Sequence, residues 1–371
     1  MKEKLSILLL LVFLFTACGG PYVKIPEDTK LGTEFQTEEE ELYTEKTVKL
    51  VLSRLDKDYP KGTKMRRDAH PKHHGCVLGS FRVNKDVPEE FKHGIFQNEK
   101  SYSTWIRISN GSIKPKEDSK GDIRGFALKL TGVEGEKILS DEKNTQDFLL
   151  INHPVLPVGS PKEYYQLFEA AFRGSPASYI FGWNPFSWKL NALSIVRKIR
   201  SKKISNMLDI RYWSTTPYRL GKYAVKYSVK PCHTPSKAIA NTTKPNYLRE
   251  VMVAHLQEKE ACFDFMVQKQ VHPTEMPVED PAVVWDEEKS PFVKLAQIHI
   301  KQQKFDSKEQ MDFCENLSFS PWHSKPEHKP LGGINRVRKV VYEKVSQFRH
   351  ERNAVERKEP TGKETFAKEN K

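Results

Sequence analysis

Apolar and polar residues alternate along several short stretches of this chain. Residues 101–109 read SYSTWIRIS, in which apolar and polar side chains alternate, a pattern typical of a strand with one face in water. Similar strand-like runs lie at 122–130, 147–155, 223–230 and 292–300. We therefore expect a sheet whose strands are spread over most of the chain.

Other stretches carry their apolar residues three or four positions apart, which is the spacing of an amphipathic helix. Helices are expected at 44–57, 161–172, 188–203, 246–261 and 335–350. Strands and helices are mixed without the regular βαβ alternation that produces parallel sheets. The pattern predicts an α+β fold built on an antiparallel sheet.

The chain begins with two lysines and an apolar run at residues 5–15, followed by Thr16, Ala17 and Cys18. The run is short for a bilayer span, so the segment is typical of a secretory signal. Its end resembles a bacterial lipobox, which implies that Cys18 is lipidated and becomes the new N-terminus. Plain cleavage and a signal anchor are the alternatives.

Composition divides the chain into four parts. Residues 1–17 are expected to be a lipoprotein signal peptide, and residues 18–43, rich in Pro, Gly, Thr and Glu, a flexible tether. One folded domain is expected at 44–357 and a charged tail at 358–371. The expected location is the bacterial cell envelope, with the protein bound to the membrane through its N-terminal lipid, in the periplasm or at the outer membrane.

Charge and cysteine usage exclude some classes of partner. The formal net charge of +13 comes from 61 basic and 48 acidic residues that are interleaved along the chain. The charge is therefore interpreted as a solvated surface, with a few arginines reserved for anions, and nucleic acid is not expected as a partner. The cysteines at 76, 232, 262 and 314 form no CxxC pair, which argues against a zinc site. One or two disulfides can form among them in an oxidising compartment, and the sequence does not determine which cysteines pair.

Arg338 and Tyr342 lie four residues apart in the last expected helix and therefore share one face of it. A guanidinium beside a phenol favours the phenolate, and tyrosinate is a recognised ligand of haem iron. The same pair also occurs by chance on many helices, where it is ordinary surface packing.

The segment RRDAHPKHHG holds His70, His73 and His74 within five positions. Histidine titrates near neutral pH, so it suits both proton transfer and metal binding. The three side chains are candidates for a catalytic base, for a metal cluster, or for ordinary surface residues.

Several blocks of the sequence, taken in order, resemble the catalase superfamily. They are RRDAHPKHHGCVLGSFRV, WIRIS, DIRGFALKL, NTQDFLLINHP and ENLSFSPWHSKP, followed by the helix in which Arg349 stands seven residues after Tyr342. The resemblance runs from about Arg67 to Arg349. It implies a catalase-like antiparallel β-barrel core with surrounding helices for residues 44–357, and haem b, with its iron, as the cofactor.

The resemblance also implies a role for individual residues. Tyr342 would be the axial ligand of the haem iron, with Arg338 beside it. His70 would move the proton of a bound peroxide, while Ser109 fixes the histidine ring and Asn144 donates a hydrogen bond to the peroxide. The expected counterions of the haem propionates are Arg67, Arg107 and Arg349.

The resemblance implies a catalase or peroxidase that decomposes hydrogen peroxide or organic hydroperoxides, lipid hydroperoxides included. Only 29 residues follow Tyr342, so the C-terminal helical domain of large catalases is expected to be absent. Leu156 stands near the place where catalases stack a phenylalanine on haem, which implies a more open access route. Whether the protein is a monomer or a homo-oligomer is left open.

Two other functions are carried as alternatives. One is the rearrangement of fatty-acid hydroperoxides, as in the allene oxide synthase branch of the superfamily. That branch has a hydroxyl residue directly before the distal histidine, whereas Ala69 stands here. The other is a non-enzymatic haem-binding lipoprotein, which would have no need of His70, Ser109 and Asn144 together.

Overall fold

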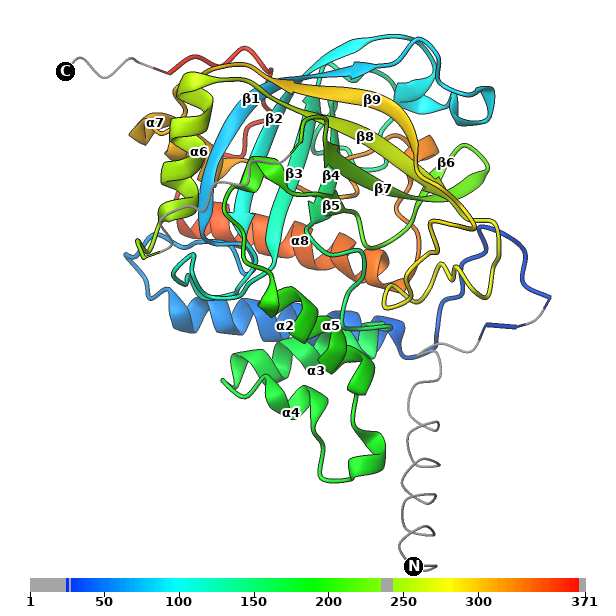
Figure 1. The fold of residues 1–371 in the computed structure, drawn as a ribbon. Coiled ribbons are helices and arrows are strands. Elements are labelled where there is room, and N and C mark those ends of the chain that lie inside the picture. Colours follow the sequence, from blue (N-terminus) through cyan, green and yellow to red (C-terminus); the bar gives the residue numbers. More distant parts are fainter. Residues whose placement is uncertain (1–24, 27, 235–242, 367–371) are drawn as a thin grey trace, which may run out of the picture.

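The strands of this protein close into an antiparallel barrel (Figure 1). The structure is a computed structural model that describes residues 25–26, 28–234 and 243–366. Its strands are β1 (His73–Val83), β2 (Ser101–Asn110), β3 (Arg124–Thr131), β4 (Thr145–Ile151), β5 (Tyr212–Trp213), β6 (Tyr218–Leu220), β7 (Tyr223–Pro231), β8 (Ala261–Lys269) and β9 (Val293–Ile300). The short strand β5 pairs with both β4 and β7, which closes an eight-stranded ring, and β6 adds to β7 outside it. The predicted α+β class and β-barrel core are thereby confirmed.

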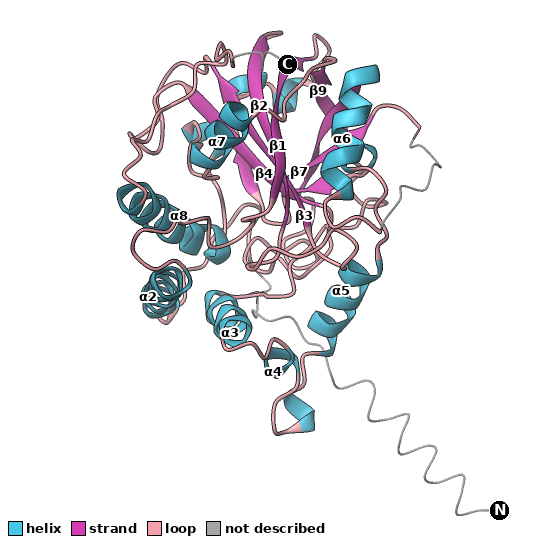
Figure 2. Cartoon of the chain, turned by 90° about the vertical axis from the view of Figure 1, so that its left-hand side faces the viewer, coloured by secondary structure: helices cyan, strands magenta, loops and turns pink. Residues whose placement is uncertain are grey.

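In the described part of the chain, α-helices surround the barrel, and most of them gather around one end of it. They are α2 (Glu40–Asp58), α3 (Pro161–Phe172), α4 (Ala177–Ile180), α5 (Leu190–Ser201), α6 (Tyr247–Glu258), α7 (Lys308–Asn316) and α8 (Gly333–Arg352). Short 3₁₀ turns are η1 (Glu89–Phe91), η2 (Gly94–Phe96), η3 (Pro185–Ser187), η4 (Met207–Asp209) and η5 (Pro326–His328). Figures 1 and 2 show α2, α3, α4, α5 and α8 around the lower end of the barrel. No helix in the described part of the chain is long and apolar enough to cross a membrane.

Aromatic side chains fill the inside of the barrel. Phe81, Phe148 and Phe265 come from different strands and are each buried. The Phe265 ring lies 5.1 Å from that of Phe81 and 4.9 Å from that of Phe148, centroid to centroid, in edge-to-face contacts. Because side chains alternate across a strand, the neighbouring residues of these strands point out of the barrel. A ligand site must therefore lie on the outer face or at an end.

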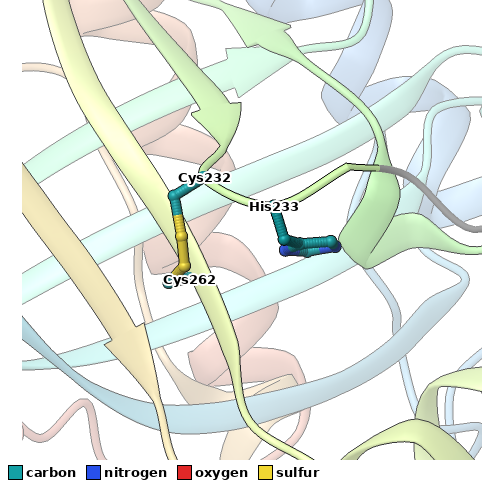
Figure 3. A group of neighbouring side chains, drawn as sticks. All are labelled: Cys232, His233 and Cys262. Atoms are coloured by element: carbon teal, nitrogen blue, oxygen red, sulfur yellow. A yellow bond between two sulfur atoms is a disulfide. The ribbon is translucent and has the colours of Figure 1, made fainter.

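Two disulfides join all four cysteines of the folded domain. Cys76 of β1 is bonded to Cys314 of α7, and Cys232 is bonded to Cys262 of β8. His233 follows Cys232, but Figure 3 shows its ring turned away from the two sulfur atoms. Its Nε2 lies 2.8 Å from a carboxylate oxygen of Asp209. The sulfurs are therefore bonded to each other, and these residues do not form a metal site.

Removal of the long-range disulfide is expected to destabilise the protein more than removal of the short-range one. The Cys76–Cys314 bond spans 238 positions and the Cys232–Cys262 bond spans 30. Loop-closure entropy then predicts that Cys76→Ala/Cys314→Ala lowers the free energy of unfolding by about 2–5 kcal/mol, and by about 2 kcal/mol more than Cys232→Ala/Cys262→Ala. Urea unfolding of the two double variants measures the difference. Equal losses would contradict the entropic argument.

The expected signal peptide and Cys18 lie outside the described residues, but much of the segment expected as a tether is held against the domain. The backbone N–H of Gly32 donates to Gln270 at 2.7 Å, and Glu34 pairs with Arg336 of α8 at 2.7 Å. Helix α2 also begins four residues before the expected 44. The prediction of a flexible tether as far as residue 43 is therefore wrong, because Glu34 and Glu40 both pair with Arg336 on a distant helix.

The tail expected at 358–371 is also packed, as far as Phe366. The indole N–H of Trp105 donates to Glu364 at 2.8 Å, and the Phe366 ring lies 5.9 Å from the Trp105 ring. Glu359 accepts a hydrogen bond from the backbone of Asn144 at 2.6 Å. The residues up to 366 therefore cover the outer face of β2 and the start of β4 instead of fraying.

Candidate functional site

A cavity of about 570 Å³ lies between the outer face of β2, β3 and β4 and the helices α3 and α8. On β2, Ile106 and Ile108 point into the barrel core, whereas Arg107 and Ser109 point outward into this cavity. The register pairs Ser109 with Gly125 on β3, and Gly125 with Ile151 on β4. One wall of the cavity is thus a flat patch formed by three neighbouring strands.

The opposite walls come from the helices and from the segment before β1. They include Arg67, Asp68, Ala69 and His70 ahead of β1, Tyr164, Leu167, Phe168, Ala171 and Phe172 on α3, and Arg338, Tyr342, Val345, Ser346 and Arg349 on α8. Exposed residues also line the cavity, namely Lys114, Lys116 and Pro176, so it opens to solvent. The sequence-predicted residues His70, Ser109, Arg67, Arg107, Arg338, Tyr342 and Arg349 all meet here.

The ring of His70 lies close to Gly125 of strand β3. Its Nδ1 is 3.0 Å from the hydroxyl oxygen of Ser109, which fixes the ring and leaves Nε2 for the cavity. A Cβ on Gly125 would come within 2.6 Å of the His70 Nδ1 and 2.8 Å of the Ser109 oxygen, so only glycine fits at that position. His70 has a φ of 58°, a left-handed conformation that is strained for a non-glycine residue and is common at functional sites.

The surroundings of His70 keep its imidazole neutral. Burial lowers the pKa of His70 to about 3, and the positive charges of Arg107 and Arg338 act in the same direction. Arg107 also donates to the backbone carbonyl of His70 at 2.8 Å, which holds the strained residue in place. The imidazole is therefore in its neutral form, which is the form that can accept a proton.

Three arginines converge on one end of the cavity; Arg107 and Arg349 are buried, and Arg67 is half-buried. Arg67 donates to the carbonyl of Glu315 at 3.1 Å, and Arg349 donates to the same oxygen at 2.8 Å. Yet Nε of Arg67, Nε of Arg107 and Nη2 of Arg349 are buried without a hydrogen-bond partner among the described residues. Burial and mutual repulsion lower the pKa of Arg349 to about 9 and that of Arg107 well below its usual value. The unpaired donors are therefore suited to a ligand that carries more than one negative charge.

Tyr342 lies on the α8 wall with a guanidinium directly beside it. Nε of Arg338 donates to the Tyr342 hydroxyl at 3.2 Å, and its Nη1 donates to Asn335 at 3.0 Å. Although burial alone would lower it, the neighbouring phenols of Tyr342 and Tyr218 raise the pKa of Arg338. The predicted Arg338–Tyr342 pair is thus present, and it faces the cavity instead of the surface.

Apolar side chains form the rest of the lining. Leu156, Leu167 and Phe168 line the cavity together with Phe172 and Phe319. Leu156 is therefore at the cavity, as its place in the sequence predicted. A large apolar ligand with an anionic edge matches this division between apolar walls and an arginine-rich end.

The structure does not bring Asn144 to this site. The residue precedes β4, and the first residue of that strand, Thr145, pairs with Thr131, whereas the far end, Ile151, pairs with Gly125 beside Ser109. Six residues of strand separate the two ends, which is about 20 Å. The prediction of Asn144 as a residue that contacts peroxide is therefore corrected. Asn152, which follows β4 at the site end, uses its side-chain oxygen for the backbone N–H of Arg124 at 2.8 Å.

The two histidines after His70 have separate partners. Nε2 of His73 lies 3.5 Å from a carboxylate oxygen of Glu315, and Nε2 of His74 lies 2.9 Å from the side-chain oxygen of Asn110. Neither ring lines the cavity that holds His70. The described residues therefore give no support to the alternative of a metal cluster on these three histidines.

A second buried group combines Glu142, Asp147 and His323, whose ligand atoms lie close together. The ammonium of Lys129 already stands among them, bonded to Glu142 and, at 2.9 Å, to Asp147. Its positive charge takes the place that a metal ion would need. We interpret this group as a buried ion-pair network that ties β3 and β4 to the segment before α8.

Sequence reasoning missed one residue that lines the cavity and one that holds two of its arginines. Tyr164 is a second phenol at the site, and burial together with the nearby Tyr342 raises its pKa well above the usual value. Glu315 supplies the carbonyl that holds Arg67 and Arg349. Tyr164 stands in the amphipathic pattern of 161–172, which indicates a helix and no chemistry, and nothing in the sequence around Glu315 indicates its role.

Three solved catalase structures share this fold. A fungal catalase is 14% identical with a TM-score of 0.59, over 88% of this chain and 66% of its own. Catalase A from Saccharomyces cerevisiae is 16% identical with a TM-score of 0.58, over 88% of this chain and 68% of its own. A bacterial catalase is 12% identical with a TM-score of 0.58, over 95% of this chain and 71% of its own. No protein-family model matches the sequence, and no curated protein is significantly similar to it. The likeness therefore shows a catalase-like fold.

Proposed function

We propose that the cavity binds haem b and that the protein is a haem-dependent catalase or peroxidase. The observation that carries this proposal is the meeting, in one cavity, of an arginine-supported phenol, a neutral strained histidine and three unpaired arginine donors. Tyr342 would hold the iron, and Arg67, Arg107 and Arg349 would hold the propionates. When bound, ferric haem would supply an iron centre at which the O–O bond of a peroxide can be cleaved.

The residues of the chain would manage the proton in that reaction. The Nε2 atom of His70 takes a proton from the peroxide oxygen and returns it to the oxygen that leaves as water or alcohol. Ser109 keeps the ring in place through Nδ1, and Arg107 holds the backbone of His70. The apolar lining from Leu156 to Phe172 accommodates an organic hydroperoxide as well as hydrogen peroxide.

A second candidate function is haem binding without turnover, which the position of Asn144 favours. The site has His70 and Ser109 but lacks the amide that sequence reasoning assigned to it. A storage or carrier protein needs the residues that hold haem and no proton relay. Rearrangement of fatty-acid hydroperoxides ranks below both, because Ala69 stands where that branch has a hydroxyl residue.

The proposed location is the bacterial cell envelope, through lipidation of Cys18. The two disulfides support it, because such bonds form and persist in oxidising compartments. Mass measurement of the N-terminal peptide from membranes of the producing cell tests the proposal. A diacylglyceryl group on Cys18 is the expected result, and an unmodified Met1 would contradict it.

The test of the main proposal is an absorption titration of the purified protein with haem, followed by peroxide. We expect saturation at one haem per chain and a ferric high-spin spectrum of the tyrosinate type, then evolution of oxygen from hydrogen peroxide or oxidation of a donor. Saturation without turnover would select the carrier function. A chain that takes up no haem would overturn both.

A further inference from the structure

Four aromatic side chains stand exposed on one short loop between α4 and α5. Trp183 is 102% exposed and Phe186 is 77% exposed, and Phe181 and Trp188 are exposed at 41% and 38%. Solvent exposure of single apolar residues is ordinary, but this group is contiguous in sequence and dominated by large rings. A surface of this kind is usually covered by something.

Local hydrogen bonds hold the loop in its projecting form. The Asn184 side chain accepts from the backbone N–H of Phe186 at 3.0 Å, and Ser187 donates to the Asn184 carbonyl at 2.8 Å. The indole N–H of Trp188 donates to the carbonyl of Gly182 at 2.9 Å, while its ring meets that of Phe181 edge to face at 5.2 Å. The turn itself is therefore satisfied, and Trp183 and Phe186 are left pointing outward.

The loop is a convex tip. Figure 1 shows the segment between α4 and α5 as the part of the described chain that extends farthest below the barrel, and Figure 2 shows the same projection from the side. A protein partner usually needs an extended patch, whereas a narrow tip can insert between lipid headgroups. Tryptophan is enriched at that interface because it has an apolar body and one polar N–H.

The charge of the surrounding chain fits an anionic surface. Residues 174–203 contain six basic side chains and no acidic one. Arg197 and Lys198 are exposed on α5 about two helical turns from the loop. This spacing places these two positive charges near the headgroups when the aromatic tip is buried by about 5–10 Å. Lys189, which directly follows the loop, is instead paired with Glu163 at 2.7 Å.

We propose that residues 181–188, the aromatic loop, dock on the surface of an anionic phospholipid bilayer. Trp183 and Phe186 enter the boundary between headgroups and acyl chains, and the basic residues of α5 face the headgroups. This contact requires neither bound haem nor lipidation of Cys18. It would fix the side of the domain that faces the membrane, which an N-terminal tether alone does not do.

Quenching of tryptophan fluorescence by brominated lipid tests this contact in the full chain. The protein is mixed with vesicles of 70% phosphatidylcholine and 30% phosphatidylglycerol whose acyl chains carry bromine near the headgroup, a composition chosen at roughly the anionic content of cell membranes. No tryptophan lies in residues 1–24. Quenching therefore reports the folded domain even when the N-terminal segment also holds the chain on the vesicle.

The wild-type chain is expected to lose at least about two-fold more emission than Trp183→Ser/Phe186→Ser on these vesicles. Val271→Ser/Val284→Ser removes exposed apolar residues elsewhere, 43% and 56% exposed, and should match the wild type. Arg197→Glu/Lys198→Glu should reduce quenching on the anionic vesicles. Equal unfolding midpoints in the three double variants exclude misfolding as the cause.

Other occupants of the loop give different results. Sedimentation can show a concentration-dependent dimer that Trp183→Ser/Phe186→Ser abolishes. If the vesicles also cause no quenching, the loop would be assigned to a second copy of this chain, and the proposal would be overturned. Absence of both quenching and dimer formation would also overturn it. Quenching that is equal in the wild type and in Trp183→Ser/Phe186→Ser would place the lipid contact elsewhere on the domain.

Discussion

Replacement of His70 by alanine is expected to lower peroxide turnover by about 10²–10⁴-fold while haem uptake stays unchanged. The ring supplies a neutral Nε2 at the cavity, and no other described histidine lines that cavity to take over the proton transfer. Steady-state oxygen release or donor oxidation, normalised to bound haem, measures the effect. Equal turnover in the wild type and in His70→Ala would contradict the role proposed for His70.

Two matched variants separate position from chemistry in this prediction. Ser109→Ala removes the 3.0 Å partner of His70 Nδ1 and should cause a smaller loss, about ten-fold, since the base remains but its ring is free to turn. Asn144→Ala should leave turnover unchanged, because that side chain lies at the other end of β4. A loss in Asn144→Ala as large as in His70→Ala would contradict the corrected placement.

The pH dependence of turnover follows from the burial of His70. Its pKa is lowered to about 3, so the imidazole is already the free base at pH 5, and turnover should not decline between pH 8 and pH 5 through this group. Bound propionates would offset part of the arginine charge, but burial, the largest cause, would remain. The depressed pKa also affects the stability of the fold. Between about pH 6.5 and pH 3 the imidazole is protonated in the unfolded chain but not in the folded one, so the free energy of unfolding falls as the pH drops through this range. An acid limb of turnover near pH 6.5 that disappears in His70→Ala would show that the imidazole is well solvated.

Local signals explain which parts of the fold could be predicted from the sequence. The expected helix at 161–172 has the bounds of α3, because Ser160 caps it and Pro161 occupies its first turn. The expected helix at 246–261 ran past its end at Glu258 into β8, which was missed. Strand β1 was missed because the residues from His73 to Val83 were considered for their histidines and not for their alternation.

Errors at the site have a non-local origin. The docking of residues 32–39 depends on Arg336, which is 302 positions away from Glu34 and gives no sign in the local composition. The role expected for Asn144 rests on the resemblance of one block, NTQDFLLINHP, whereas its distance from His70 depends on how β2, β3 and β4 pair. The pairs that are four apart on a helix, such as Arg338 and Tyr342, were the reliable part because helix geometry alone brings them together.

Replacement of Tyr342 by phenylalanine is expected to weaken haem binding at least about 100-fold, since it removes the proposed ligand of the iron. The phenyl ring keeps the packing of Tyr342 against the α2 and α8 cluster, so the fold should be retained. Haem titration followed by the absorption spectrum measures both affinity and ligation. Any haem that remains should lack the tyrosinate bands.

Tyr164→Phe is the matched control for this prediction, because it removes a second phenol from the same cavity. It should keep both the affinity and the spectrum of the wild type. If Tyr164→Phe loses haem and Tyr342→Phe retains it, the iron ligand would be assigned to α3 instead of α8. The Arg338–Tyr342 pair would then be a structural contact. Unchanged binding in both variants would point to a ligand from the segment before β1, where His70 is the available side chain, and would exclude His70 as a free base.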